Sequence, residues 1–467
     1  MSDAIHLPAL RRGVTYRSVD ALRLANGAEI SQVNSGLIRR DLLRGTAAER
    51  PPVRRMIAIC REAGARFRSA TLPLCEGIQQ SPEDFLSQVA ATGGLPRTLI
   101  RAGMERVAKV LDDMEQILAG LSRGLDPAVI DDGIGQQAGI PVSYHPTTEV
   151  LSVVLPSNSP GVNALWLPAI ALRTAVAIKP GRDDPWTPWR IIQALLAAGC
   201  PAELLSFYPT DHEGSHALLR TAGRSLLFGD AAVAKRYARD PRVEIHGPGH
   251  SKVLIGADHA DRWRDHLDLL VKSVAANSGR SCINASAIVT HAHADVLAHA
   301  LAERLGSMRP RDLDDPAADL AGFSNAAAAE LIDAAITAGL AEPGAADISA
   351  TYRAGPRLVV HRGRSYLLPT VIRCTSFDHP LARKEYPFPY CAVVELPQAG
   401  MLGRLGPTLV VSALSDDPVW RRQLLASPLI QRLNLGAMAT SHVQWDQPHE
   451  GNLFEFLYHR RAVQVAA

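Results

Sequence analysis

Apolar residues in the first third of the chain recur at the three- and four-residue spacing of amphipathic helices. The pattern is present over residues 54–67, 82–91 and 95–121 and predicts three helices. Gly120 and Gly124 stand at the end of the last one, as glycine often does at a helix terminus. This part of the chain is therefore predicted to be mainly helical.

From residue 151 the apolar residues form short continuous runs instead. The runs are SVVLPSN, TAVAIKPG, SLLFGD and SKVLIGAD, with helical patterns between them. Strands that are buried on both faces and alternate with helices are typical of a parallel α/β sheet. Such a sheet usually binds its ligand at the carboxyl ends of the strands, where Asn158, Lys179 and Asp230 fall. We expect Trp186 and Trp189 to pack on the helix after the second run.

A second α/β pattern extends from about residue 266 to 435. Between the helical part and the first strand, residues 131–146 (DDGIGQQAGIPVSYHP) are polar and contain glycine, which indicates an extended excursion. The C-terminal segment LFEFLYHRRAVQV is strand-like and apolar for a chain end. An apolar terminal strand needs an edge with which to pair, in its own chain or in another subunit.

Composition excludes several classes of function. With 467 residues, two or three domains are expected. Charged residues make up 21% of the chain and the net charge is +2, so neither disorder nor nucleic-acid binding is indicated. No apolar run is long enough to cross a membrane, and the N-terminus does not resemble a signal peptide. The six cysteines show no metal-ligand spacing, which favours a reduced, cytoplasmic protein without a metal.

Cys282 lies in the most informative segment, VAANSGRSCINASAIVTH. Its small neighbours Gly279, Ser281 and Ala285 would let a flat ring or a carbonyl group approach the sulfur. Arg280 could favour the thiolate, which is the nucleophilic form. Taken by itself, a cysteine among small residues is more often a buried structural thiol, so the interpretation depends on the rest of the sequence.

Six segments, in order, resemble segments of the aldehyde dehydrogenase superfamily. They are SNSPG (with Asn158), AVAIKPG (Lys179), GPGHSKVLIGAD, NSGRSC (Cys282), YLLPTVI followed by KEYPFP (Glu385), and RLNLG (Asn434). Each segment is short, but their order and spacing together indicate the family. The resemblance covers about residues 139–458. The first 120 or so residues match only in their helical character.

This resemblance implies an α/β fold with a Rossmann-type dinucleotide-binding domain, an α/β catalytic domain and a small β oligomerisation arm, with the active site between the two large domains. The predicted division assigns residues 1–130 to an N-terminal helical part of the cofactor domain, 131–150 to the arm, 151–255 to the dinucleotide-binding domain, 256–440 to the catalytic domain and 441–467 to a C-terminal arm. The arm implies a homodimer or a homotetramer.

The resemblance also implies the chemistry. The Cys282 thiolate attacks an aldehyde carbon, while the Asn158 amide and a backbone N–H stabilise the oxyanion. Hydride passes to the nicotinamide of NAD or NADP and leaves a thioester on Cys282. Lys179 and Glu385 contact the two riboses. An aldehyde or an acyl thioester is the expected substrate.

The chain departs from the family pattern at the residue that activates water. Hydrolytic members carry a glutamate shortly before the GKS-like segment, and an ungapped alignment places His246 there. Glu244 would take that place only if a bulge shifted the register. A GPG-containing strand without the glutamate resembles CoA-acylating aldehyde dehydrogenases and acyl-CoA reductases, in which a thiol is the acceptor. A thiol with a pKa of about 8.5 needs less help from a base than water does, so CoA is the predicted co-substrate.

Two departures concern the cofactor. Arg182 stands where an acidic residue often binds the adenosine ribose. Because arginine pairs with phosphate, NADP is slightly favoured over NAD. Gly229 and Asp230 replace the Gly-Ser pair that contacts the pyrophosphate. Gly229 is kept as a cofactor-binding candidate, whereas Asp230 is expected to cap the following helix.

Four alternatives stay open or are set aside. A hydrolytic aldehyde dehydrogenase would use His246 or another base. A non-catalytic scaffold relative is disfavoured because Cys282, Asn158 and Glu385 are all present. The acyl-phosphate reductases share the fold and the nucleophile but match the GPGHS strand less well. His291 and His293 form an H-x-H pair without a third ligand nearby, which favours a surface turn over a metal site.

Overall fold

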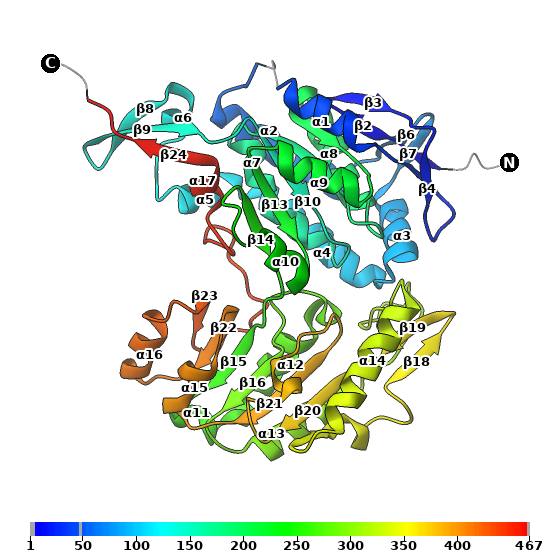
Figure 1. The fold of residues 1–467 in the computed structure, drawn as a ribbon, viewed down its shortest axis with the longest axis vertical. Coiled ribbons are helices and arrows are strands. Elements are labelled where there is room, and N and C mark those ends of the chain that lie inside the picture. The colour runs from blue at the N-terminus through cyan, green and yellow to red at the C-terminus, as the bar shows by residue number, and fades with distance from the viewer. Residues whose placement is uncertain (1–4, 46–48, 465–467) are drawn as a thin grey trace. The chain divides into compact units, whose positions relative to one another are not determined.

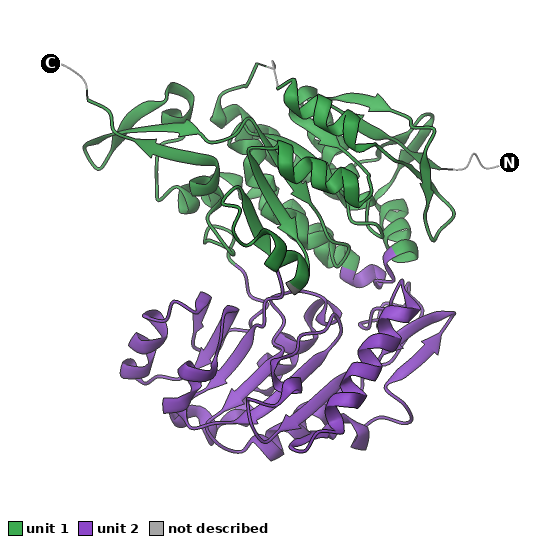
Figure 2. Ribbon diagram, in the orientation of Figure 1, with its two compact units in different colours: residues 1–92, 100–246, 444–467 green, residues 93–99, 247–443 purple. Residues whose placement is uncertain are grey.

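The computed structural model describes residues 5–45 and 49–464. The chain divides into two compact units (Figure 2). Unit 1 comprises residues 1–92, 100–246 and 444–467, and unit 2 comprises residues 93–99 and 247–443. In the part of the chain that the structure describes, no helix is both long and apolar enough to cross a membrane.

The core of unit 1 is a seven-stranded sheet with the strand order β14-β13-β10-β11-β12-β2-β3. The first five strands are mutually parallel, whereas β2 and β3 are antiparallel to their neighbours. The bounds are β14 (Val243–His246), β13 (Arg224–Phe228), β10 (Val150–Val154), β11 (Ala175–Lys179), β12 (Leu205–Phe207), β2 (Ala9–Arg11) and β3 (Val14–Tyr16). The chain builds β11 and β12 on one side of β10 and then returns to place β13 on its other side. This reversal of direction makes the carboxyl end of β10 a topological switch point, the usual ligand position in such sheets.

Helices precede this sheet and alternate with its strands (Figure 1). They are α1 (Ser35–Leu43), α2 (Val53–Ser69), α3 (Pro82–Gly93), α4 (Arg97–Asp112), α5 (Met114–Leu121), α6 (Ala128–Asp132), α7 (Leu167–Ala171), α8 (Trp186–Ala197), α9 (His212–Thr221) and α10 (Ala231–Tyr237). Trp186 and Trp189 of α8 are buried, and Trp189 packs on Phe207 with ring centroids 5.3 Å apart, which confirms their predicted packing role. The single helix predicted over residues 95–121 is two helices, because Asp113 leaves the helical conformation with ψ of 12°.

The core of unit 2 is a second seven-stranded sheet with the order β17-β20-β21-β16-β15-β22-β23. All neighbours are parallel except β17 and β20. The strands are β17 (Ala345–Asp347), β20 (Thr370–Cys374), β21 (Tyr390–Glu395), β16 (Ala287–Thr290), β15 (Lys252–Ile255), β22 (Thr408–Leu414) and β23 (Ile430–Leu435). Successive residues of β15 enter different core clusters, Val253 and Ile255 one and Leu254 the other. Both faces of the sheet are therefore buried, as predicted for parallel strands.

Apart from α11, the helices of unit 2 contribute residues to these two clusters. The helices are α11 (Ala257–Ala260), α12 (Leu267–Ala275), α13 (Ala294–Leu305), α14 (Ala326–Leu340), α15 (Gln398–Arg404) and α16 (Pro418–Leu425). Leu270 of α12 and Leu301 of α13 pack with Val253, whereas Ile336 of α14 and Trp420 of α16 pack with Leu254.

The remaining strands form small sheets: β1 (His6–Leu7), β4 (Ala21–Arg23) and β5 (Glu29–Ser31); β6 (Leu72–Cys75) and β7 (Ile78–Gln80); β18 (Leu358–His361) and β19 (Arg364–Leu367).

The division between the units differs from the predicted one. The strand at residues 252–255 was assigned to the dinucleotide-binding domain, but β15 pairs with β16 and β22 at the centre of the second sheet. The boundary therefore falls after His246 rather than after Ile255. Residues 93–99, predicted to belong with the N-terminal helices, lie in unit 2, where the Arg97 N–H donates to Leu313 O at 2.8 Å. An apolar run shows that a strand exists but not which strands pair with it.

A three-stranded sheet corresponds to the predicted β arm. It consists of β8 (Ile134–Gln137), β9 (Ile140–Pro146) and β24 (Tyr458–Arg461), and β24 lies beside β9 in Figure 1. The prediction of a strand over the whole C-terminal segment was wrong, because Leu453–Leu457 is helix α17. Asn452 caps this helix by accepting from the N–H groups of Phe454 and Glu455. The last three residues of the predicted C-terminal arm, 465–467, lie outside the described residues.

Candidate active site

Four of the predicted site residues lie at the carboxyl edge of the unit 1 sheet. Asn158 follows β10, Lys179 ends β11, Gly229 follows β13 and His246 ends β14. The loops after β10 and β11 are in contact, since Ser157 Oγ accepts from the Asp183 N–H at 3.0 Å. The switch-point geometry thus places on one sheet edge residues that are far apart in the sequence.

A cavity of about 350 Å³ opens beside Lys179, and we call it the Lys179 pocket. Burial lowers the pKa of the Lys179 ammonium, while Arg182 at the same cavity is exposed. The lining also holds Asp211, whose carboxylate caps α9 by accepting from the Gly214 N–H at 2.9 Å. Residues from three segments form the wall: Leu22, Ile30, Gln32, Lys179, Pro180, Gly181, Arg182, Pro209, Thr210, Asp211, His212 and Ser215. The pocket is concave and carries two basic side chains, which suits a ligand with anionic groups.

Asp230 caps α10, as predicted. Its carboxylate accepts from the N–H groups of Ala232 at 3.0 Å and Val233 at 2.9 Å. At Gly229 a β-carbon would lie 2.6 Å from a methyl group of Val233, so this position needs glycine for close packing of the helix. The Gly229 N–H donates to His246 O at 3.1 Å. A cofactor contact at Gly229 stays a prediction.

His246 is clamped between two carboxylates. Its Nδ1 lies 2.5 Å from Glu450 Oε2 and its Nε2 lies 3.4 Å from Glu244 Oε1, while its ring stacks on Phe228. Burial alone would lower the pKa of the imidazole, but the two glutamates outweigh it and raise the pKa to about 9. His246 is therefore an imidazolium near neutral pH, which cannot accept a proton.

The strand that carries His246 is regular. Glu244 pairs with Leu226 and His246 with Phe228, without a bulge. The register shift that would have placed Glu244 at the His246 position is therefore absent, and the two side chains share one face of β14. Glu450 comes from the C-terminal segment in a left-handed conformation with φ of 57°. Nothing near it in the sequence indicated that it would reach β14.

In unit 2, Cys282 lies in the loop between α12 and β16 and is half-buried. The residues before it have unusual backbone geometry, since Asn277, Ser278 and Gly279 all have positive φ of 51°, 56° and 68°. Non-glycine residues in this region store strain of about 1 to 3 kcal/mol each, and such strain is common at functional sites. Asn284 holds the loop closed by donating to the carbonyls of Ser273 and Ala276.

The other five cysteines are less suited to act as nucleophiles. Burial raises the pKa of the Cys200 and Cys374 thiols to about 12, and it also raises the pKa of Cys60, Cys391 and Cys75. Because the thiolate is the reactive form, a raised pKa makes a cysteine less reactive near neutral pH. Their surroundings indicate packing roles.

The loop Gly249–Ser251, which we call the glycine-histidine turn, joins the two predicted site residues of unit 2. Ser251 Oγ donates to Cys282 O at 2.8 Å. The Gly249 and His250 N–H groups donate to the two Glu385 carboxylate oxygens at 3.3 and 2.5 Å. Cys282 and Glu385, 103 residues apart in the sequence, are thus held by one turn. The GPGHS motif marked this segment, but its role as a bridge was not predicted.

Comparison with known proteins decides the family. A family model described as the aldehyde dehydrogenase family matches residues 65–398. The chain belongs to the aldehyde dehydrogenase family. Its members are oxidoreductases that act on aldehydes.

The curated relatives of this aldehyde dehydrogenase are distant. N-succinylglutamate 5-semialdehyde dehydrogenase of Sphingopyxis alaskensis is 26% identical over 66% of this chain and 64% of that protein. Geranial dehydrogenase of Castellaniella defragrans is 24% identical over 52% of each chain. The chain thus spans less than two thirds of the length of these curated relatives.

Solved structures show the same fold over nearly the whole chain. Indole-3-acetaldehyde dehydrogenase, solved in a complex with NAD⁺, superposes with a TM-score of 0.80 at 16% identity, covering 98% of this chain and 96% of that one. The NAD⁺ complex of an aldehyde dehydrogenase from Bacillus cereus gives 0.80 at 14% identity, with the same coverage of each chain. At these identities the likeness supports the fold and not a substrate.

Two residues that the sequence analysis singled out hold backbone segments of unit 2 in this aldehyde dehydrogenase. The Arg280 guanidinium donates to the carbonyls of Gly93 at 2.9 Å and Gly322 at 2.5 Å. These bonds make it an anchor for two backbone segments, and its effect on the Cys282 thiolate stays a prediction. Asn434 likewise donates to Ser412 Oγ and Ala439 O, which secures the end of the second sheet.

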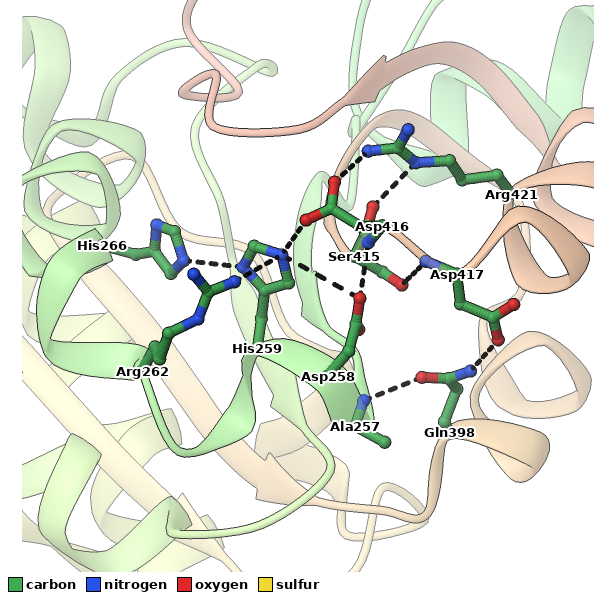
Figure 3. A network of polar contacts seen from close by, with 10 residues as sticks. All are labelled: Ala257, Asp258, His259, Arg262, His266, Gln398, Ser415, Asp416, Asp417 and Arg421. Carbon is green, nitrogen blue, oxygen red and sulfur yellow. Dashed lines mark hydrogen bonds and ion pairs between the residues drawn. The ribbon is translucent and has the colours of Figure 1, made fainter.

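The carboxyl edge of the unit 2 sheet carries a polar network (Figure 3). Among the described residues, Asp258, His259 and Asp416 have donor atoms within 4.8 Å of one another and form the one group with the spacing of a metal site. Arg262 lies 3.2 Å from His259 Nε2, and Arg421 pairs with Asp416 at 2.7 Å. These guanidinium groups supply the positive charge that a cation would bring, so the network is explained without a metal.

The H-x-H pair that sequence analysis singled out does not form a shared site. His291 Nδ1 accepts from the Gln398 N–H, while exposed His293 pairs with Asp261 at 2.7 Å. His293 has a left-handed backbone with φ of 66°, just before α13. This geometry agrees with the predicted surface turn.

Proposed function

We propose that the protein interconverts an aldehyde and an acyl group through a thioester on Cys282, with NAD or NADP as the redox partner. The observation that carries this proposal is the meeting of Cys282 and Glu385 on the glycine-histidine turn. A half-buried cysteine and a carboxylate that accepts two N–H bonds, both held by one turn, fit the nucleophile and the ribose ligand that the family resemblance predicts.

The residues of the Lys179 pocket fit a nicotinamide dinucleotide. The cavity lies at the carboxyl edge of a parallel sheet and carries Lys179 and Arg182, which would hold the adenosine ribose and a 2′-phosphate. Arg182 therefore favours NADP, while Asp211 in the same lining leaves NAD possible. When bound, the dinucleotide supplies a two-electron acceptor for the hydride of the aldehyde carbon.

The chain's own residues would perform the remaining steps. The Cys282 thiolate forms a C–S bond with the aldehyde carbon, and the carbonyl electrons move to oxygen. The family resemblance assigns the stabilisation of this oxyanion to the Asn158 amide. After oxidation, an acceptor attacks the thioester, the C–S bond breaks, and Cys282 leaves as a thiolate.

We propose that the acceptor is a thiol such as CoA. His246 stands where hydrolytic family members place the glutamate that activates water, and it is held as an imidazolium by Glu244 and Glu450. An imidazolium cannot remove a proton from water, whereas a thiol ionises with little assistance. This observation supports thiol acylation over hydrolysis.

Hydrolysis to a carboxylic acid is the second candidate. It is favoured by the curated relatives, whose names describe dehydrogenases of a semialdehyde and of geranial and do not mention CoA. A base other than His246 would then be required.

Product chromatography separates the two candidates. The purified protein is given a panel of aldehydes with NAD⁺ or NADP⁺, with and without CoA. Thiol acylation predicts acyl-CoA and little turnover without CoA. Steady formation of free acid at an undiminished rate without CoA would establish hydrolysis instead. Cys282→Ala serves as the inactive control for either product.

A further inference from the structure

Lys252 is a buried cation directly behind the glycine-histidine turn. It begins β15 and is 4% exposed. Its ammonium donates to His250 O at 2.5 Å and to Thr408 Oγ1 at 2.9 Å, and it lies 6.0 Å from the centre of the Phe377 ring. Every described contact of this ammonium is therefore with unit 2.

A lysine in this position costs free energy, because an ammonium loses its hydration on burial. Burial lowers the pKa of Lys252 to about 8, while the nearby Glu385 carboxylate raises it in part. Burial lowers the pKa of His250, and the charges of Lys252 and Lys384 lower it further. Because burying this charge costs free energy, the hydrogen bonds of Lys252 to His250 and Thr408 are expected to have a structural role.

The peptide groups of the turn are fixed from two sides. His250 has a left-handed backbone with φ of 44°, which is uncommon for a residue with a side chain. The N–H groups of Gly249 and His250 point to Glu385, and the carbonyl of His250 points to Lys252. The same turn carries Ser251, which holds the Cys282 carbonyl. Lys252 thus supports the backbone on which both site residues depend.

We propose that Lys252 is a positioning residue of the active site, which holds the glycine-histidine turn in the conformation that orients Glu385 and the Cys282 backbone. The proposal rests on the proposed function for its effect on turnover. Its structural consequence, the placement of Cys282 and Glu385, can be measured without turnover.

The test compares Lys252→Met, Lys252→Arg and the control Lys272→Met, which changes an exposed lysine of α12 in the same unit. Methionine keeps much of the volume and removes the cost of burying a charge, so the fold is expected to persist. Misplacement of a site by about 1 Å costs up to about a hundredfold in rate. We expect Lys252→Met to lower kcat by about ten- to a hundredfold. We also expect it to change the rate of Cys282 alkylation by iodoacetamide and to weaken NADPH binding, each by more than about twofold.

Lys252→Arg retains the charge and the donors and is expected to recover most of the alkylation rate and of the NADPH affinity measured by fluorescence. Thermal unfolding of all variants shows whether the fold is intact. The proposal is overturned if Lys252→Met alkylates and binds NADPH within about twofold of the unchanged protein, or if Met and Arg lose activity equally and in step with Tm. Retained turnover in Cys282→Ala would instead contradict the proposed function while leaving the alkylation and binding results for Lys252 interpretable.

Discussion

Gly249 lies directly against the backbone of Cys282, so that a β-carbon at position 249 would overlap the Cys282 carbonyl oxygen. Two residues further along, Ser251 Oγ donates a hydrogen bond to the same oxygen at 2.8 Å. The nucleophile loop and the glycine-histidine turn are thus in contact through their main chains. A change in one displaces the other.

Gly249→Ala tests this contact. The added methyl group has no room, because its neighbour is a backbone carbonyl and not a flexible side chain. We expect a loss of activity of about a hundredfold, since a displacement of about 1 Å is enough for such a loss. Steady-state kinetics and thermal unfolding are the measurements. Gly403→Ala, at a site of α15 with open space around the new carbon, is the control and should change neither; equal activity of the two variants would contradict the contact.

Cys282→Ala is expected to abolish turnover and leave the fold and cofactor affinity nearly unchanged. The Cys282 sulfur is the atom that would carry the acyl group. The contact with Ser251 is to the main chain of residue 282, which the substitution leaves in place. Intact-protein mass spectrometry after a single turnover should show the acyl mass on the unchanged protein and none on the variant. Cys75→Ala, which changes another half-buried thiol, should retain both activity and the acyl mass. Activity in Cys282→Ala would end the assignment of the nucleophile.

Arg182→Glu tests the choice of cofactor. If Arg182 pairs with a 2′-phosphate in the Lys179 pocket, a glutamate there repels it and raises KM for NADP⁺ at least about tenfold, with a much smaller effect on KM for NAD⁺. Kinetics with both cofactors measure the difference. Arg39→Glu, on the exposed face of α1, provides a matched reversal of charge away from the pocket. Equal changes for NAD⁺ and NADP⁺ would show that Arg182 does not contact the 2′ position.

The His246 clamp predicts a pH dependence of stability. Its folded-state pKa of about 9 lies above the ordinary value of 6.5 because Glu244 and Glu450 outweigh the effect of burial. A raised histidine pKa contributes stability that is fully present below about pH 6.5 and is lost as the pH rises through about 9. The unfolding midpoint should therefore fall over this interval.

Glu450→Gln removes one partner of the clamp. We expect it to lower the free energy of unfolding by about 1.5 to 3 kcal/mol near pH 6.5, the range for a hydrogen bond to a charged group, and by less above pH 9. Denaturant unfolding across pH 6 to 10 measures both effects. Glu455→Gln, which breaks an exposed ion pair with Arg123, should have a small effect that depends little on pH. The clamp would be disproved if the free energy of unfolding of Glu450→Gln changed with pH in parallel with that of the unchanged protein.

Much of the fold was predictable because its signals are local. Runs of apolar residues predicted buried strands. The residue types and positions of Asp230 and Trp189 predicted a helix cap and a packing contact. The boundaries were harder. Helix α17 was mistaken for a strand because five apolar or aromatic residues in seven mask the helical spacing, and only the Asn452 cap distinguishes it.

The sequence by itself determined the family, since six segments in the right order carry the residue types that its chemistry needs. It also determined that the first sheet would be largely parallel and that a second α/β segment would follow, because apolar strands alternate with helices. These properties are specified by short segments of the chain. They do not depend on which distant residues become neighbours.

Only the tertiary structure decided how those residues are supported. Glu450 reaches His246 across 204 positions and Ser251 reaches Cys282 across 31, and neither pair shares a local pattern. Lys252 begins a strand, and only the fold places its ammonium behind the His250 carbonyl. Hydrogen bonds between segments depend on the packing of whole sheets, and a strand's own residues do not specify its partners. The protonation of His246 and the anchoring of Glu385 therefore emerge only once the chain has folded.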